Sequence, residues 1–284
     1  MRSPPAGEAD AAGMTDSPAV AAVDVWRAFQ RERVLTGVRV EIPRGCGVAI
    51  LGPNGAGKST FLRVCAGALR PQRGWVRIYG EDLWRVPAAR GRIGFVGHEP
   101  MLYGGLTVLE NLRLFASLYD LPDGAARADE VCTLLDIRRR HDPVRNLSRG
   151  LQQRAALARA IAHRPEVLLL DEPLTGLDPD AAHRLCEFLE GFRARGGTVV
   201  AATHSPAEAL RIADRAYVLT GGRLSEVRIL DGMTADAVQA WYRLMTGARE
   251  RPVAGPEDGA GLSASGTEPS AYGVSQRCTR ERRP

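Results

Sequence analysis

Lysine is almost absent from this chain of 284 residues: 37 of its 38 basic residues are arginine, and the one lysine is Lys58. Arginine therefore serves every surface position at which a solvated cation is sufficient. A position that keeps lysine in such a chain indicates a need for a compact ammonium group, which a planar guanidinium does not replace. The residues around Lys58 are therefore the first candidates for chemistry.

Long apolar runs are also missing. None approaches the roughly 18 to 20 residues of a membrane span, and residues 1–25 lack a basic segment followed by an apolar one, so we expect a chain neither exported nor self-inserting. The five cysteines lack C-x-x-C spacing, which favours buried thiols in a reducing compartment over disulfides or zinc ligands. No aromatic RNA-binding signature accompanies the net charge of +5, so we expect no nucleic-acid partner.

The segment that holds the lysine fits the phosphate-loop pattern G-x-x-x-x-G-K-[ST]. Its glycines let backbone N–H groups surround phosphate oxygens, while the lysine reaches the β- and γ-phosphates and Ser59 ligates Mg²⁺. An apolar run at 47–51 predicts a strand before the loop, and the apolar residues of 61–67 have helical spacing after it. The N-terminus of that helix would therefore lie against the phosphates. The predicted nucleotide-binding residues of the loop are Gly52, Pro53, Asn54, Gly55, Ala56, Gly57, Lys58, Ser59 and Thr60.

The apolar pattern predicts an α/β fold between residues 19 and 229. Strand-like runs dominate 19–79, helical periodicity dominates about 100–162, and apolar strands alternate with helices from residue 167 onward. Such alternation is typical of a parallel sheet covered on both faces. The predicted fold class is therefore a P-loop NTPase with a mostly parallel core sheet, an N-terminal antiparallel β layer and an inserted helical lobe.

The chain ends differ from this core in composition. Residues 1–18 have nothing periodic to bury and are predicted to be disordered, with Met14 a candidate for the real start. Apolar residues at i, i+3, i+4 and i+7 predict an amphipathic helix within 230–247. We favour packing of this helix on its own domain, with a partner surface as the alternative. The tail at 248–284 is predicted to be flexible.

Two carboxylates follow a fully apolar run at 167–170. Ligands of parallel α/β sheets gather at the carboxyl ends of the strands, so we expect Asp171 and Glu172 to face the phosphate loop. Asp171 would hold Mg²⁺, directly or through water, and Glu172 could polarise the water that attacks the γ-phosphorus. The predicted reaction is hydrolysis of a nucleoside triphosphate.

Residues 146–154 read N-L-S-R-G-L-Q-Q-R and precede a helical run. The stretch resembles the L-S-G-G-Q signature of ATP-binding cassette (ABC) ATPases: Ser148 and Gly150 are kept, while Arg149 replaces a glycine and Leu151 replaces the glutamine. The resemblance extends in order over about residues 20–228. It includes the T-G-L-D segment that ends at Asp178, and the T-H pair that ends at His204.

The resemblance implies roles for these positions. Glu172 and His204 would be catalytic, with His204 contacting the γ-phosphate, and Phe29 would stack on adenine. Ser148, Arg149, Gly150 and Asp178 would contact ATP, and Ser59, Asp171 and His98 would be placed at Mg²⁺.

Two positions depart from the family pattern. Counting back from residues 106–112 places His98 where the family usually has a glutamine that links the nucleotide to the helical lobe. His98 could contact Mg²⁺, the attacking water or only the partner, because imidazole offers one donor and one acceptor. Arg149 adds a cation at the signature, which either helps to bind an anion or points to solvent.

In this family the phosphate loop of one subunit faces the signature of another. The resemblance therefore implies a dimer with two equivalent ATP sites, and a separate transmembrane permease subunit that keeps the protein peripheral at the cytoplasmic face of the cell membrane. Within the family the motifs look most like the haem-exporter ATPase of cytochrome c maturation, with multidrug or antibiotic efflux ATPases as the alternative.

Two other classes fit less well. A soluble ABC protein that acts on ribosomes or DNA would normally have a second cassette, a long coiled coil or zinc cysteines, none of which the sequence contains. A GTPase would need an N-K-x-D motif, which a chain with Lys58 as its one lysine cannot form.

Overall fold

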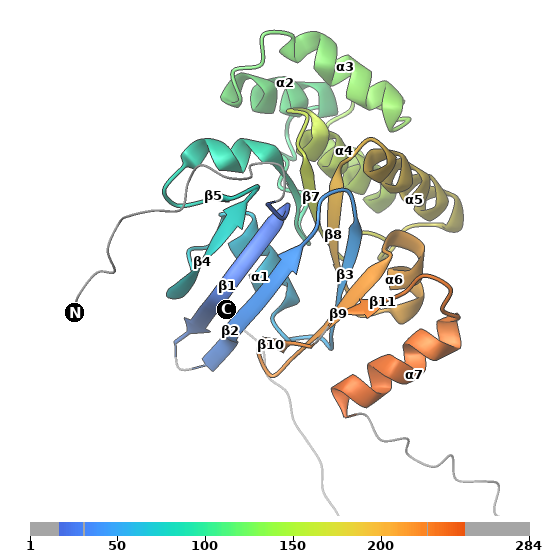
Figure 1. The fold of residues 1–284 in the computed structure, drawn as a ribbon. Helices are drawn as coiled ribbons and strands as arrows, with labels where there is room; N and C mark the ends of the chain where they lie inside the picture. Colours follow the sequence, from blue (N-terminus) through green and yellow to red (C-terminus); the bar gives the residue numbers. More distant parts are fainter. Residues whose placement is uncertain (1–16, 31, 226, 248–284) are drawn as a thin grey trace, which may run out of the picture. The chain divides into compact units, whose positions relative to one another are not determined.

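The computed structural model describes residues 17–30, 32–225 and 227–247 (Figure 1). The predicted disorder of residues 1–18 falls mostly outside this part, since only Ser17 and Pro18 are described. The predicted flexible tail at 248–284 lies wholly outside it.

An antiparallel layer forms the first part of the described chain. Its strands are β1 (Val20–Phe29), β2 (Glu32–Ile42), β4 (Arg73–Ile78) and β5 (Glu81–Asp82), in the order β2-β1-β4-β5. Alternate residues of β2 are buried, which is the pattern of a strand with one face on a core.

The second sheet is mostly parallel. Its order is β10-β9-β3-β8-β7-β6, with parallel pairing from β9 through β3, β8 and β7 to β6. The central strands are fully buried because helices or the antiparallel layer cover both faces. The predicted fold class is therefore confirmed. The bounds are β3 (Gly47–Leu51), β6 (Ile93–Val96), β7 (Val167–Asp171), β8 (Thr198–Thr203), β9 (Arg215–Thr220), β10 (Arg223–Leu224) and β11 (Arg228–Ile229), the last pairing with β9.

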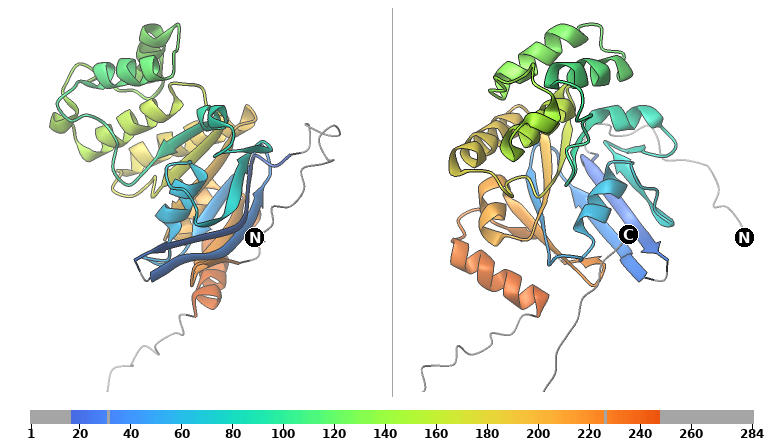
Figure 2. Two further views of the ribbon diagram at one scale, coloured as in Figure 1. Left: turned by 90° about the vertical axis from the view of Figure 1, so that its left-hand side faces the viewer. Right: turned by 180° about the vertical axis from the view of Figure 1, so that it is seen from behind.

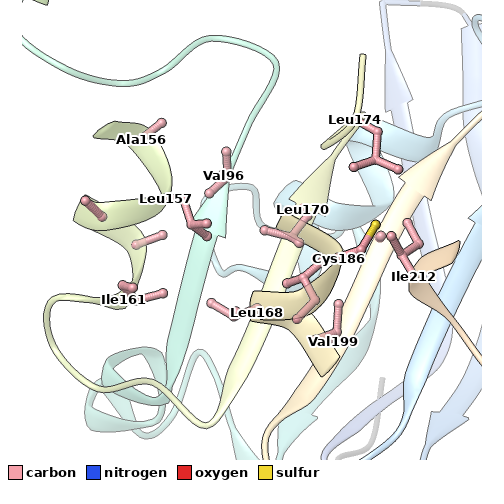
Figure 3. Close-up of a cluster of buried hydrophobic side chains, with 14 of the residues drawn as sticks. Val96, Ala156, Leu157, Ile161, Leu168, Leu170, Leu174, Cys186, Val199 and Ile212 are labelled. Atoms are coloured by element: carbon pink, nitrogen blue, oxygen red, sulfur yellow. The ribbon is translucent and has the colours of Figure 1, made fainter. Parts of the chain in front are cut away.

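Helix α1 (Lys58–Cys65) packs between the two sheets. Its Phe61 and Leu62 are completely buried in the same apolar cluster as Ile42 and Ile78 of the antiparallel layer. A second cluster fills the opposite face of the parallel sheet, where α5 (Pro179–Ala194) and α6 (Pro206–Ile212) lie. Figure 3 shows Leu168, Leu170 and Val199 of the sheet packed with side chains from these helices. The carboxyl ends of the strands are thus held rigidly.

Three helices form the inserted lobe: α2 (Val108–Leu118), α3 (Gly124–Leu134) and α4 (Arg149–Ile161). Short 3₁₀ turns, η1 (Pro87–Arg92) and η2 (Val144–Asn146), precede β6 and α4 respectively. Helix α2 starts with a capping box, in which the Thr107 hydroxyl accepts from the Glu110 N–H and the Glu110 carboxylate accepts from the Thr107 N–H. The three helices lie together beyond the edge of the sheets at β6 and β7 (Figures 1 and 2). Helix α4 also lies against the core, where it packs on β6.

Helix α7 (Ala235–Thr246) completes the described chain and packs on α6 and β9. Its Val238 is fully buried in the main core together with Leu230, so the helix covers its own domain, as we favoured. Strands β10 and β11 and helix α7 extend the core beyond Gly222. The additional strands are only two residues long, too short to produce a periodic signal.

Cys46, Cys65, Cys132 and Cys186 are buried free thiols, and burial raises the pKa of Cys46 and of Cys132 to about 11. These four thiols are buried, as predicted, whereas Cys278 lies outside the described residues. Among the helices that the structure describes, none combines the length and apolar character of a membrane span.

Candidate nucleotide-binding site

The phosphate loop connects the end of β3 to the start of α1. Gly55 and Gly57 have φ angles of 80° and 100°, a region that favours glycine. A Cβ at Gly57 would lie 2.9 Å from a methyl carbon of Val34, so a side chain there would also push β2 away from the loop. The first N–H groups of α1 therefore face the space above the loop, where an anionic group is stabilised.

Lys58 is held inside this loop. The residue is 6% exposed, and its ammonium group donates to the carbonyl oxygens of Gly52 at 2.8 Å and Pro53 at 3.2 Å. The Glu172 carboxylate lies 3.7 Å away. Burial lowers the pKa of Lys58, while the charges of Glu172 and Asp171 oppose that shift. The ammonium is thus fixed where the loop meets the carboxylates.

A cleft of about 640 Å³ opens above the loop. The structure brings together here eleven of the residues predicted at the nucleotide or the metal ion. Phe29 lines the cleft and is 43% exposed, and the Arg27 guanidinium lies 4.9 Å from the centroid of its ring. The eleven residues are Phe29, Asn54, Gly55, Gly57, Lys58, Ser59, Thr60, His98, Asp171, Glu172 and His204.

Asp171 ends β7 with a buried carboxylate, and neither of its oxygens has a hydrogen-bond partner. Burial raises the pKa of Asp171, and the neighbouring charge of Glu172 adds to that rise. The Ser59 hydroxyl and His98 act in the other direction and lower the pKa of Asp171, although the hydroxyl lies outside hydrogen-bond geometry. An unpartnered carboxylate beside a hydroxyl fits Mg²⁺, which takes oxygen ligands and needs few from the protein when phosphates supply others. Within the described residues no cluster of three His, Cys, Asp or Glu side chains suited to a metal ion exists.

Glu172 and His204 form a pair beside Lys58. The Nδ1 atom of His204 lies 3.0 Å from both carboxylate oxygens of Glu172, and the Thr175 hydroxyl lies 3.3 Å from one of them. Glu172 has a φ angle of 50°, which is unusual for a residue with a side chain, and its N–H donates to Ala202 of the neighbouring strand. Strain of this kind persists where the surroundings fix the backbone, often at functional sites.

The signature residues lie elsewhere in the same chain. Ser148 caps helix α4, and its hydroxyl accepts from the Leu151 N–H at 3.4 Å. Gly150 is half-buried, and the nearest atom to a Cβ built there belongs to Leu177, 3.8 Å away, whereas Ser148 is exposed. Asp178 caps α5 by accepting from the Ala181 N–H at 2.8 Å, a bond that lowers its pKa. None of Ser148, Gly150 and Asp178 lines the cleft.

Arg149 lines a second hollow of about 550 Å³ that adjoins the cleft. The two hollows share His98, Asp171, Glu172 and Thr175. The Arg149 side chain packs against Gly176 of its own chain, since its Nε atom lies 3.1 Å from a Cβ built there. Arg149 is thus an exposed side chain that lies over Gly176 beside this hollow, and it does not line the cleft that holds Lys58.

Sequence reasoning did not assign several residues that shape the site. Glu32 and Val34 line the cleft, and no motif includes them. The buried Thr203 hydroxyl donates to Glu208 at 2.7 Å and accepts from the Ser205 N–H, which fixes the backbone on both sides of His204. The S-x-x-E spacing of Ser205 and Glu208 is a capping-box pattern, but the Glu208 carboxylate accepts from the Thr203 hydroxyl and the Ser205 N–H donates to Thr203 instead.

The fold and the cleft define the class of this protein as a P-loop nucleoside triphosphatase. A family model described as "ABC transporter" matches residues 35–175. The Nod factor export ATP-binding protein I of Ralstonia nicotianae is 35% identical over 216 residues, which cover 74% of this chain and 67% of that protein. The chain therefore belongs to the ATP-binding proteins of ABC transporters, and its ATP-binding domain is an ATPase coupled to transport.

Solved structures agree with this assignment. An ATP-binding subunit of an ABC transporter has a TM-score of 0.71 and 31% identity, covering 78% of this chain and 98% of its own. A dimeric ATP-binding cassette in a post-hydrolysis state, bound to ADP and Pi, has a TM-score of 0.68 and 29% identity, covering 75% of this chain and all of its own. The name of the Ralstonia relative refers to export of a Nod factor, so it does not bear out the more specific likeness to a haem exporter.

Proposed function

We propose that this chain is the energising subunit of an exporter and hydrolyses ATP at sites shared by two copies. One observation carries the proposal: Lys58, Asp171, Glu172 and His204 share one cleft, whereas Ser148 and Gly150 lie outside it, with Ser148 exposed. A second copy would bring its own Ser148 and Gly150 to the cleft. ATP would then join the two copies.

In this proposal the loop binds the phosphates and the carboxylates prepare the metal site. The N–H groups at the start of α1 and the Lys58 ammonium bind the β- and γ-phosphates, and Phe29 stacks on the adenine. Ser59 and Asp171, with His98 nearby, would hold Mg²⁺. When bound, that ion neutralises phosphate charge and orients the γ-phosphoryl group.

Glu172 is the proposed general base. Its carboxylate accepts a proton from the attacking water, and the Thr175 hydroxyl holds it in place. His204 lies on the other side of the carboxylate, where its ring can turn from Glu172 to the γ-phosphate when ATP fills the cleft. Release of Lys58 from the Gly52 and Pro53 carbonyls toward the phosphates accompanies that change.

The membrane partner and the cargo belong to the same proposal. We propose a separate transmembrane permease subunit that holds this chain at the cytoplasmic face of the membrane, and movement of the helical lobe on dimer closure that drives the permease. Haem for cytochrome c biogenesis is one candidate cargo, because the signature at 146–154 and the G-H-E-P segment at 97–100 resemble those of the haem-exporter ATPase. A Nod factor or related molecule is the second, because relatives at 35% to 39% identity bear that name. Multidrug or antibiotic efflux remains the alternative.

Purification of the tagged chain with its membrane complex tests this proposal. We expect a polytopic membrane subunit to co-purify and to be identified by mass spectrometry, and ATP hydrolysis by the complex to rise with the true cargo. Haem and a Nod factor are the two probes to compare. A chain that purifies with ribosomes, and with no membrane protein, would contradict the transport role.

His98 offers a separate prediction, because it lines both hollows and lies near the Asp171 carboxylate. If it links the site to the helical lobe, His98→Ala should keep ATP affinity within about 2-fold but remove most stimulation by the membrane subunit. His98→Gln supplies the side chain that the family usually has and should retain hydrolysis. The measurement is ATPase activity with and without the membrane subunit. Full stimulation of His98→Ala would place the coupling contact elsewhere, with Glu99 the next residue to test.

A further inference from the structure

Arg149 occupies a position at which a cation is electrostatically unfavourable. It is the first residue of α4, and the first turn of that helix contains no acidic side chain. The N-terminus of a helix carries a partial positive charge, so a guanidinium there is repelled unless another contact compensates. The Glu99, Asp171 and Glu172 carboxylates of the hollow that Arg149 lines offset this repulsion, and the packing contact of the side chain indicates what Arg149 does.

That contact is the turn at Gly176. The Nε, Cζ and Cδ atoms of Arg149 lie 3.1, 3.2 and 3.3 Å from the position of a Cβ built on Gly176. Three consecutive atoms at nearly equal distance mean that the side chain lies flat over the glycine. Gly176 also has a φ angle of 76°, so this position disfavours a side chain for two independent reasons.

Nothing else in the described part of the chain holds this guanidinium. No hydrogen bond or ion pair joins it to a described residue, although Glu99, Asp171 and Glu172 line the same hollow. The three carboxylates attract the cation toward the hollow as a whole, and the flat contact decides where it lies. Arg149 thus acts on the turn by packing.

The turn under Arg149 leads directly to Glu172. The Thr175 N–H donates to the Glu172 carbonyl at 3.2 Å, and the Thr175 hydroxyl lies 3.3 Å from the Glu172 carboxylate. A displacement of Gly176 therefore moves the hydroxyl that holds the carboxylate. Helix α4 belongs to the helical lobe, so the contact connects that lobe to Glu172 within one chain.

We propose that Arg149 is a positioning residue that holds the Thr175–Gly176 turn and thereby sets where the Glu172 carboxylate lies as the helical lobe moves. This inference rests on the proposed role of Glu172 as the general base. Arg149 acts through the turn in its own chain, and direct contact with ATP is the competing role.

Four variants of the full chain separate these roles: Arg149→Ala, Arg149→Lys, Gly176→Ala and the double variant with both alanines. We expect Arg149→Ala to lower kcat about 10-fold with KM for ATP within about 2-fold, because a small misplacement of a reacting group costs rate more than binding. Arg149→Lys should not restore kcat, since an ammonium on a flexible stem lacks the flat surface that covers Gly176.

Gly176→Ala should reproduce the loss, because its methyl group displaces Arg149 and its φ angle of 76° strains the turn itself. Residues that act through one contact are not additive, so the double variant should be no slower than Gly176→Ala alone. Arg195→Ala, which removes an exposed arginine at the far end of α5, should match the parent chain. Thermal unfolding of each variant shows that it is folded.

Three results would overturn the inference. The first is a raised KM for ATP in Arg149→Ala that Arg149→Lys restores, because it would show direct contact between residue 149 and ATP. The second is a parental kcat for Arg149→Ala. The third is additive losses of kcat in the double variant. Glu172→Gln measured in parallel separates the two proposals. If Glu172→Gln hydrolyses ATP normally, the proposed role of Glu172 is wrong. If Glu172→Gln is inactive while Arg149→Ala is normal, only the proposed role of Arg149 is refuted.

Discussion

Glu172→Gln should lower steady-state ATP hydrolysis by about 10²- to 10⁴-fold, the range expected for loss of a general base. The amide keeps the size of the side chain and can still contact the Thr175 hydroxyl, but it cannot accept a proton from water. ATP binding should survive, because Lys58 and the loop are unchanged. We therefore expect the variant to accumulate as an ATP-bound dimer, visible by size-exclusion chromatography with ATP and Mg²⁺.

A matched control residue lies just before the start of β7, the strand that Glu172 follows. Glu166 precedes β7, is 51% exposed and pairs with Arg92, far from the carboxyl end of the sheet. Glu166→Gln should hydrolyse ATP like the parent chain and should not accumulate as a dimer. Parental turnover by Glu172→Gln would remove Glu172 from the role of base and make His204 the next candidate.

Lys58→Ala should weaken binding of ATP by about 10- to 100-fold, which corresponds to loss of a hydrogen bond to a charged group. The variant removes the ammonium that the Gly52 and Pro53 carbonyls hold at the loop. Lys58→Arg should fail nearly as badly, because a planar guanidinium does not fit the space of a buried ammonium. Equilibrium titration with a fluorescent ATP analogue and Mg²⁺ measures both.

Arg39→Ala provides the control for loss of one positive charge, since Arg39 is exposed on β2 and does not line the cleft. Its affinity for ATP should match that of the parent chain. If Lys58→Ala binds ATP with parental affinity while remaining folded, the loop does not bind the phosphates as proposed.

Much of the fold followed from periodicity in the sequence. The buried strands β3, β7 and β8 are continuous apolar runs, and the amphipathic stripe near the C-terminus became α7. The elements that the sequence did not predict are short or weakly periodic. Strand β6 has four residues with glycine at its second position, and β10 and β11 have two residues each. Their pairing is decided by tertiary contacts, which one segment does not encode.

The candidate site shows the same division. The phosphate loop and the carboxylates after β7 are local motifs with fixed chemistry, so sequence placed Lys58 and Glu172 next to each other although 113 residues separate them. The orientation of Arg149 toward Gly176 was not available from sequence, because a side chain's direction depends on which neighbours the fold supplies. The same holds for Thr203 and Glu208, whose bond fixes the His204 loop.

Disulfide crosslinking between two differently tagged copies tests the shared site most directly. One copy carries Asn54→Cys, at the exposed tip of the phosphate loop, and the other carries Ser148→Cys, at the signature; both carry Glu172→Gln so that ATP is not consumed. The four described native cysteines are buried and should not interfere, and Cys278 is replaced by serine. We predict an ATP-dependent crosslink between the two copies, absent when two Asn54→Cys chains are mixed. Equal crosslinking with and without ATP, or none in the mixed pair, would contradict an ATP site completed by the signature of a second copy.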